Sequence, residues 1–282
     1  MRKSLFVLAT SLLILVAAAG QATADPAPPG VAHAMGYYLA LGDSLAAGYQ
    51  PDQGDDKTGG YVGGTLAAIT SAKPKTRLIN LACSGETVVT LTTGGRCSYE
   101  LGSQLAQAVD FLEHHGRFTR VITLNIGSND VQTCVNRTTL AIDMVCIQNG
   151  FTSIDAGLPA ALATLRSLAP KATIIVLNYY NPFLAAYLAG PAGQAVAEQS
   201  AGLQAQLNSI IANAAAANGA RLADVAAVFK STEWMPVAVP GFGTLPTNVG
   251  MICRWTLMCT NSDIHPNAEG YAVIAATVVA HL

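Results

Sequence analysis

Short apolar runs alternate along this chain with longer segments of helical periodicity. The strands expected from these runs lie at residues 37–41, 77–81, 121–126, 172–177 and 221–225. The run at 172–177 (ATIIVL) is apolar and β-branched, which is typical of a strand buried on both faces of a parallel sheet. Strands that alternate with helices build a mostly parallel sheet covered by helices on both faces. The sequence therefore predicts an α/β fold.

The expected helices fill the segments between these strands. Leu101, Leu105, Ala108 and Leu112 recur at the spacing of one helical face, which predicts a helix over 101–115. Further helices are expected after the Gly59-Gly60 turn and at 154–168, 192–218 and 268–282. Because no internal repeat and no interdomain linker is visible, we expect a single domain over 36–282, after a Pro-rich leader at 25–35.

The first 24 residues have the organisation of an export signal. Arg2 and Lys3 precede an apolar run from Leu5 to Ala19, and Ala22-Thr23-Ala24 supplies the small-x-small pattern that signal peptidase accepts. The apolar run is short for a transmembrane helix. We expect cleavage near Ala24 and a secreted protein without a stable membrane anchor, a retained N-terminal anchor being the alternative.

Charge and composition exclude several classes of protein. Apolar residues make up 51% of the chain and charged residues 11%, whereas an ordinary soluble domain has about 25% charged residues. This composition excludes a disordered chain and a coiled coil. The formal net charge of −2 becomes −4 after cleavage, because the signal carries two basic and no acidic residues. We therefore expect no nucleic-acid partner, and we expect a monomer.

Six cysteines fit an oxidising compartment. An even number in an exported chain predicts three disulfides, which six cysteines can form in about 15 ways. We favour sequential pairs because the cysteines form three local couples, 14, 12 and 6 residues apart; free buried thiols are the alternative. The favoured pairs are Cys83–Cys97, Cys134–Cys146 and Cys253–Cys259.

Four short motifs carry residues suited to ester chemistry. Ser44 follows the first expected strand, Gly85 the second and Asn129 the third, and His265 precedes the last helix. The carboxyl ends of parallel strands share one edge of a sheet, so these motifs should converge there. Each residue alone also has a structural reading, such as a helix cap for Ser44 or a turn for Gly85.

Together these residues can form a serine-hydrolase site. A serine hydroxyl needs a neighbouring base to become a nucleophile, and His265 is suited to that role. Asp263 is the nearest carboxylate that could orient its imidazole. The backbone N–H groups of Ser44 and Gly85 and the side-chain amide of Asn129 could form an oxyanion hole. This chemistry requires neither a metal nor a cofactor.

With these residues in view, the chain resembles the SGNH, or GDSL, hydrolase family. Ser44, Gly85, Asn129 and His265 match the four letters of the name in chain order, within Leu41-Gly42-Asp43-Ser44-Leu45 and Gly127-Ser128-Asn129-Asp130. The resemblance is strongest to exported actinobacterial members with three disulfides. It implies a flavodoxin-like three-layer α/β/α sandwich with a mostly parallel five-stranded sheet, and esterase or lipase activity.

One departure from the family pattern concerns the acid. The family usually places it three residues before the histidine, where this chain has Ser262, whereas Asp263 is two residues before His265. Some relatives orient the imidazole with a backbone carbonyl instead. Both alternatives remain open at this point.

Two apolar segments are candidates for the walls of the substrate site. They are 179–190 and 234–258, which contain most of the aromatic residues of the second half of the chain. Apolar walls suit an acyl chain better than a sugar, although both segments could instead pack onto the sheet. The leading prediction is a secreted esterase or lipase for small-molecule or lipid esters; the alternatives are a carbohydrate O-deacetylase and a catalytically silent binding protein.

Overall fold

The computed structural model describes residues 36–136, 138, 139 and 141–282. From Gly36 onward these residues belong to one compact unit. The predicted signal peptide and Pro-rich leader lie outside the described residues.

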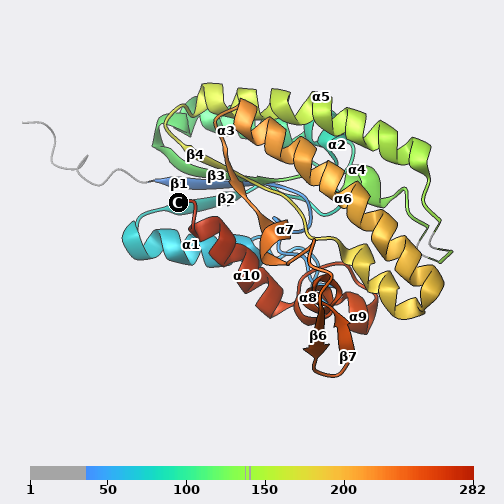
Figure 1. Ribbon diagram of the computed structural model, residues 1–282. Helices are drawn as coiled ribbons and strands as arrows, with labels where there is room; N and C mark the ends of the chain where they lie inside the picture. The colour runs from blue at the N-terminus through green and yellow to red at the C-terminus, as the bar shows by residue number, and fades with distance from the viewer. Residues whose placement is uncertain (1–35, 137, 140) are drawn as a thin grey trace, which may run out of the picture. The chain divides into compact units, whose positions relative to one another are not determined.

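A five-stranded sheet forms the centre of this unit (Figure 1). Its strands are β1 (Tyr37–Gly42), β2 (Arg77–Asn80), β3 (Thr119–Asn125), β4 (Thr173–Leu177) and β5 (Arg221–Ala223). All neighbouring pairs are parallel, in the order β2-β1-β3-β4-β5. The predicted α/β class and five-stranded parallel sheet are therefore confirmed.

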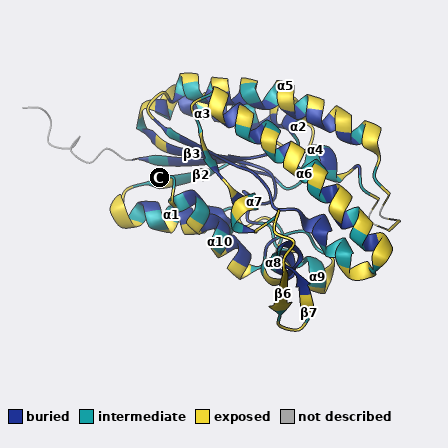
Figure 2. Cartoon of the chain, in the orientation of Figure 1, coloured by how far each residue is buried: buried dark blue, intermediate teal, exposed yellow. Residues whose placement is uncertain are grey.

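Helices cover both faces of the sheet. α1 (Gly60–Ala72) and α10 (Ala268–Val279) pack together on one face. On the other face lie α2 (Val88–Thr93), α3 (Gln104–His115), α5 (Met144–Leu168) and α6 (Pro191–Ala217). The three central strands, β1, β3 and β4, are largely buried between the two layers (Figure 2). Among the described helices, none has the length and apolar character needed to cross a membrane.

Several predicted boundaries were wrong. The helix expected at 101–115 begins at Gln104, and the helix expected at 268–282 ends at Val279. The helix expected from residue 154 begins at Met144, because Asp143 accepts hydrogen bonds from the backbone N–H groups of Val145 and Cys146 and caps it. The strand expected at 221–225 ends at Ala223, because Asp224 caps a short helix, α7 (Val225–Val228).

Several short elements were not predicted. They are α2, α4 (Asn129–Gln132), the 3-10 segments η1 (Gly116–Phe118) and η2 (Pro182–Ala189), the antiparallel hairpin of β6 (Pro236–Val239) and β7 (Gly243–Pro246), α8 (Thr247–Trp255) and α9 (Met258–Asn261). Elements this short do not produce a clear periodicity in the sequence.

The strand order determines where a site can form. β1 lies between β2 and β3. The chain therefore passes from β1 to β2 on one side and then crosses to β3 on the other side, so the strand order reverses at β1. In open parallel sheets such a reversal leaves a crevice beyond the carboxyl ends of the strands. Ser44 follows β1 and Asn129 follows β3, so both lie at this crevice.

Candidate active site

Ser44 lies in a tight turn directly after β1. Gly42 has a φ of +129°, and a Cβ atom there would lie 2.0 Å from the carbonyl oxygen of Asn125. Only glycine therefore allows β1 to approach β3 this closely. The buried amide of Gln104 holds the same residue: Oε1 accepts from the Gly42 N–H at 2.6 Å, and Nε2 donates to the Gly42 carbonyl at 3.0 Å. The backbone leading to Ser44 is thus held on both sides.

Ser44, His265 and Asp263 form one hydrogen-bonded line. Ser44 Oγ lies 2.8 Å from Nε2 of His265, although the two residues are 221 positions apart in sequence. On the other side of the ring, Nδ1 lies 2.7 Å from Oδ1 of Asp263. The distances are those of a nucleophile, its base and an orienting carboxylate.

Aromatic residues hold the histidine loop in place. The Tyr180 hydroxyl donates to the backbone carbonyl of Ile264 at 2.6 Å. The Tyr49 ring packs against the His265 imidazole, with a centroid distance of 4.4 Å. Behind them, Tyr180 stacks on Phe229 at 4.5 Å. The imidazole is therefore fixed by packing as well as by Asp263.

Asp43, the neighbour of the serine, is buried beside Tyr179. Its Oδ1 accepts from the backbone N–H of Leu45 at 3.0 Å, and its Oδ2 accepts from the Tyr179 hydroxyl at 2.5 Å. Burial raises the pKa of Asp43 to about 7, although both hydrogen bonds act in the opposite direction. Asp43 connects the serine turn to the end of β4.

Two backbone donors and one side chain are available for an oxyanion. Among the described residues, the N–H groups of Ser44 and Gly85 have no hydrogen-bond acceptor. The Asn129 amide donates to the carbonyl of Glu86 at 2.9 Å. An amide nitrogen carries two hydrogens, so a second one remains for a substrate oxygen. The bond to Glu86 also ties Asn129 to the loop that contains Gly85.

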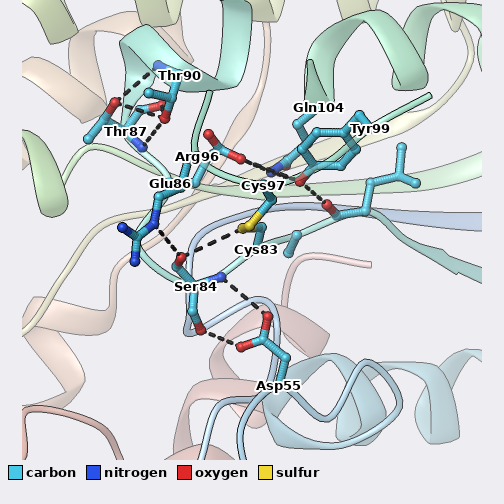
Figure 3. The surroundings of a disulfide bond; sticks show 12 residues. Asp55, Cys83, Ser84, Glu86, Thr87, Thr90, Arg96, Cys97, Tyr99 and Gln104 are labelled. Atoms are coloured by element: carbon cyan, nitrogen blue, oxygen red, sulfur yellow. Dashed lines mark hydrogen bonds between the residues drawn. A yellow bond between two sulfur atoms is a disulfide. The ribbon is translucent and has the colours of Figure 1, made fainter. Parts of the chain in front are cut away.

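The Gly85 loop is held by a dense set of contacts (Figure 3). The disulfide Cys83–Cys97 closes it, and Arg96 Nε donates to the Ser84 carbonyl at 3.0 Å. The Ser84 hydroxyl donates to Asp55. Gly85 has a φ of +81°, a conformation that favours glycine.

A buried polar network connects this loop to the serine turn. Gln104 Nε2 lies 3.2 Å from Glu86 Oε2 and 3.0 Å from the Tyr99 hydroxyl, and the same amide binds Gly42. Glu86 and Gln104 are completely buried. The loop that carries Gly85 and the turn that carries Ser44 are therefore positioned by one side chain.

Asp130 also has a structural contact. Its carboxylate accepts from the backbone N–H of Val88, the first residue of α2, at 3.0 Å and 3.2 Å. Burial raises its pKa to about 6. This bond fixes α2 against the Asn129 loop.

A narrow cleft, partly open to solvent, lies beside the serine. Its walls include Ser44, Asn129 and His265, together with Tyr179, Tyr180 and Pro182. Gly85 does not line this cleft, although its loop is bonded to Asn129. Of the two apolar segments expected as walls, 179–190 contributes and 234–258 does not, because the latter folds into the β6–β7 hairpin and α8.

The other two disulfides lie close to the remaining motifs. Cys134–Cys146 joins the segment after α4 to the first turn of α5, and Cys253–Cys259 joins α8 to α9. All six cysteines are paired in the sequential pattern. Within the described ranges, no group of three or more His, Cys, Asp or Glu residues is arranged to hold a metal ion.

Sequence reasoning missed several residues that build the site. Gln104, Tyr49 and Gln132 were not singled out. A buried glutamine at the start of an amphipathic helix is a weak signal, because Gln is common at exposed helix positions. Their partners lie far away in the sequence, and only the fold brings them together.

Solved structures of lipases and of a phospholipase share this fold. A lipase of Streptomyces rimosus shares 21% identity (TM-score 0.57), with 88% of this chain and 100% of that chain covered. The structure of a putative GDSL-like lipase from Parabacteroides merdae shares 15% identity with this chain (TM-score 0.55), with 86% of this chain and 93% of that chain covered. Phospholipase A1 of Streptomyces albidoflavus shares 21% identity (TM-score 0.52), with 88% of this chain and 100% of that chain covered.

Comparison with curated proteins found no match. The model of the GDSL-like lipase/acylhydrolase family, in contrast, matches residues 40–273. This range contains Ser44, Gly85, Asn129 and His265, and it runs from the middle of β1 through β5. The chain belongs to the GDSL-like lipase/acylhydrolase family.

Proposed function

We propose that the protein is a secreted serine esterase or lipase, which hydrolyses carboxylic esters through an acyl-enzyme intermediate on Ser44. The observation that carries this proposal is the line of hydrogen bonds from Ser44 Oγ through His265 to Asp263. The backbone N–H of Ser44 and the side-chain amide of Asn129, both of which lie at the cleft, support it.

In the first half-reaction, Ser44 Oγ attacks the ester carbonyl carbon. His265 Nε2 takes the hydroxyl proton, and Asp263 stabilises the imidazolium and holds its orientation. The carbonyl oxygen becomes an oxyanion, which the Asn129 amide and the N–H groups of Ser44 and Gly85 stabilise. The bond to the alcohol oxygen then breaks, and His265 returns the proton to the departing alcohol.

In the second half-reaction, water replaces the alcohol. His265 removes a proton from this water as its oxygen attacks the acyl carbon. The bond to Ser44 Oγ breaks, and His265 protonates the serine again. The products are a carboxylic acid and the free enzyme.

The cleft favours an acyl ester over an acetylated carbohydrate. Aromatic rings and aliphatic side chains, including Leu45, Tyr180 and Pro182, form much of its wall. The lipase and phospholipase named among the structural neighbours are in keeping with this choice. A carbohydrate O-deacetylase with the same catalytic residues is the second candidate, and acetylated xylan is the substrate that distinguishes it.

Two observations support export. The residues before Asp25 have the pattern of a signal peptide, and three disulfides are favoured in an oxidising compartment. Protein recovered from the medium of an exporting host should begin at Asp25 on N-terminal sequencing. An N-terminus at Met1 would contradict cleavage.

Substitution of Ser44 tests the mechanism. Ser44→Ala should abolish hydrolysis of acyl esters and labelling by a fluorophosphonate probe, while the far-UV circular dichroism remains unchanged. Ser153→Ala, which removes a partly exposed hydroxyl on α5, is the matched control and should keep both hydrolysis and labelling. Unlabelled wild-type protein would instead favour a silent binding protein.

A further inference from the structure

Arg96 is an exposed arginine whose side chain lies against the Gly85 loop. We propose that Arg96 is a positioning residue for ester hydrolysis: by holding the Ser84 carbonyl, it fixes the direction of the Gly85 N–H and keeps this donor aimed at the oxyanion. The proposal rests on the proposed function, because it takes Ser44 as the residue that is acylated and Gly85 as an oxyanion donor.

Ser84 and Gly85 are the two central residues of a β-turn. The Glu86 N–H donates to the Cys83 carbonyl at 3.2 Å, which closes the turn. Gly85 has a φ of +81°, whereas Ser84 does not have a positive φ. This combination identifies a type II turn, since both central residues of a type I′ turn have a positive φ.

The peptide between Ser84 and Gly85 is the part of a type II turn that can reverse. Type I and type II turns differ mainly by a rotation of this central peptide through about 180°, with the residues at both ends kept in place. Because a trans peptide is planar, the Ser84 carbonyl and the Gly85 N–H point in opposite directions and turn together. A contact that fixes the Ser84 carbonyl therefore also fixes the oxyanion donor.

Arg96 supplies that contact. Its Nε donates to the Ser84 carbonyl at 3.0 Å (Figure 3). The guanidinium lies against Gly85, where a Cβ atom would be 2.5 Å from both Nε and Cζ of Arg96. Among the described residues, no carboxylate forms an ion pair with Arg96. A charged donor makes a stronger hydrogen bond, and it polarises the peptide so that the Gly85 N–H becomes a better donor.

The fold keeps Arg96 beside the turn. The segment that contains Arg96 runs antiparallel to the Gly85 loop, and three contacts join the two in one register: the hydrogen bond Arg96–Ser84, the disulfide Cys97–Cys83, and the 2.8 Å bond from the Tyr99 hydroxyl to the Leu81 carbonyl. On the other side, Asp55 Oδ2 accepts from the Ser84 N–H at 3.3 Å. These contacts should let the bond from Arg96 persist although its side chain is exposed.

Two neutral substitutions separate the hydrogen bond from the charge. Arg96→Gln keeps an N–H donor at the position of Nε along the side chain, whereas Arg96→Met keeps the length of the stem without a donor. We expect Arg96→Met to lower kcat for p-nitrophenyl acetate by roughly 5- to 100-fold, less than the roughly 10²–10³-fold cost of removing an oxyanion donor outright. KM should change less than about twofold. Arg96→Gln should recover the larger part of the lost kcat.

The matched control is Arg166→Met. Arg166 also donates to backbone carbonyls, those of Ala172 at 2.8 Å and Gly219 at 2.9 Å, but these residues precede β4 and β5 at the opposite edge of the sheet from Ser44. This variant should keep the wild-type kcat and KM. Circular dichroism identifies any variant that does not fold, and Arg96→Ala replaces Arg96→Met if the latter is unfolded.

A spectroscopic test follows the peptide itself. The dipeptide Ser-Gly occurs once in the chain, at 84–85. Oxidising cell-free synthesis with carbonyl-¹³C serine and ¹⁵N glycine therefore gives a single ¹³C–¹⁵N coupled amide signal. After complete reaction of Ser44 with a fluorophosphonate, whose phosphonyl oxygen stands in for the oxyanion, the Gly85 amide proton should move downfield in the wild type and in Arg166→Met. The shift should be smaller in Arg96→Met and intermediate in Arg96→Gln.

The outcomes separate this proposal from the proposed function. Absence of turnover and of phosphonylation in folded wild-type protein would contradict the proposed function itself. Turnover with a Gly85 signal that does not move on phosphonylation would overturn the positioning role alone. The same conclusion follows if folded Arg96→Met keeps the wild-type kcat or changes KM only, or if Arg96→Gln is as impaired as Arg96→Met.

Discussion

Asp263 Oδ1 lies 2.7 Å from Nδ1 of His265 and 2.9 Å from the backbone nitrogen of the same residue. An aspartate that accepts from the backbone two residues later forms an Asx-turn. This turn brings the carboxylate under the imidazole although only Ile264 separates the two residues. Ser262, at the position where the family usually has its acid, has a φ of +54° and turns the chain into this arrangement.

The first prediction concerns this carboxylate. Asp263→Asn keeps an oxygen for the Asx-turn but removes the charge that stabilises the imidazolium. We expect kcat/KM for an acyl ester to fall at least about tenfold, and by as much as roughly 10⁴. Asp52→Asn, at an exposed loop carboxylate, is the control. A smaller loss at Asp263 would favour a backbone carbonyl as the orienting group.

The second prediction concerns Asn129, the proposed oxyanion donor. Asn129→Ala removes the amide that lines the cleft and should lower kcat by roughly 10²–10³, equivalent to about 2.7–4 kcal/mol, with a smaller effect on KM. Asn129→Asp keeps the shape but offers no donor, so it should be impaired at least as strongly. Steady-state kinetics measure both constants. A change in KM alone would assign Asn129 to substrate binding.

The third prediction concerns the buried Asp43. Its pKa rises from 3.8 to about 7 on folding, mainly because of burial. The folded protein therefore binds this proton more tightly than the unfolded chain, so stability from this group is complete below pH 3.8 and is lost as the pH rises to about 7. In the wild type, the free energy of unfolding should therefore decrease as the pH rises from 3.8 to about 7. In Asp43→Asn this decrease should be smaller, because asparagine does not titrate.

Urea denaturation of both proteins across this pH range measures the effect. Asp52→Asn serves as the control for a change of net charge. Parallel curves for the wild type and Asp43→Asn would show that Asp43 does not bind this proton in the folded state.

The fourth prediction concerns the disulfide beside Gly85. Cys83→Ser/Cys97→Ser should lower kcat more than tenfold, because a displacement of an oxyanion donor by about 1 Å can cost on the order of 10²-fold in rate. The sheet does not depend on this bond, so the far-UV circular dichroism should persist. Mild reduction of the wild type should likewise remove activity before secondary structure. Full activity after complete reduction would contradict this role.

The sequence by itself determined the class of the fold and the identity of the motifs. The apolar runs of β1 to β5 and the periodicity of α3 are local properties, because each depends on residues within one element. The motifs that contain Ser44 and His265 were visible for the same reason, and the family match over 40–273 agrees with them.

Only the tertiary structure decided how these motifs meet. Three features join distant parts of the chain: the 2.8 Å contact between Ser44 and His265, the two hydrogen bonds of Gln104 to Gly42, and the wall of the cleft, which residues 179–182 form and residues 234–258 do not. Such contacts depend on how whole elements pack, which no short stretch of sequence encodes. The Asx-turn at Asp263 is local, but its contact with the imidazole depends on the loop that Tyr180 and Tyr49 hold against the end of the sheet.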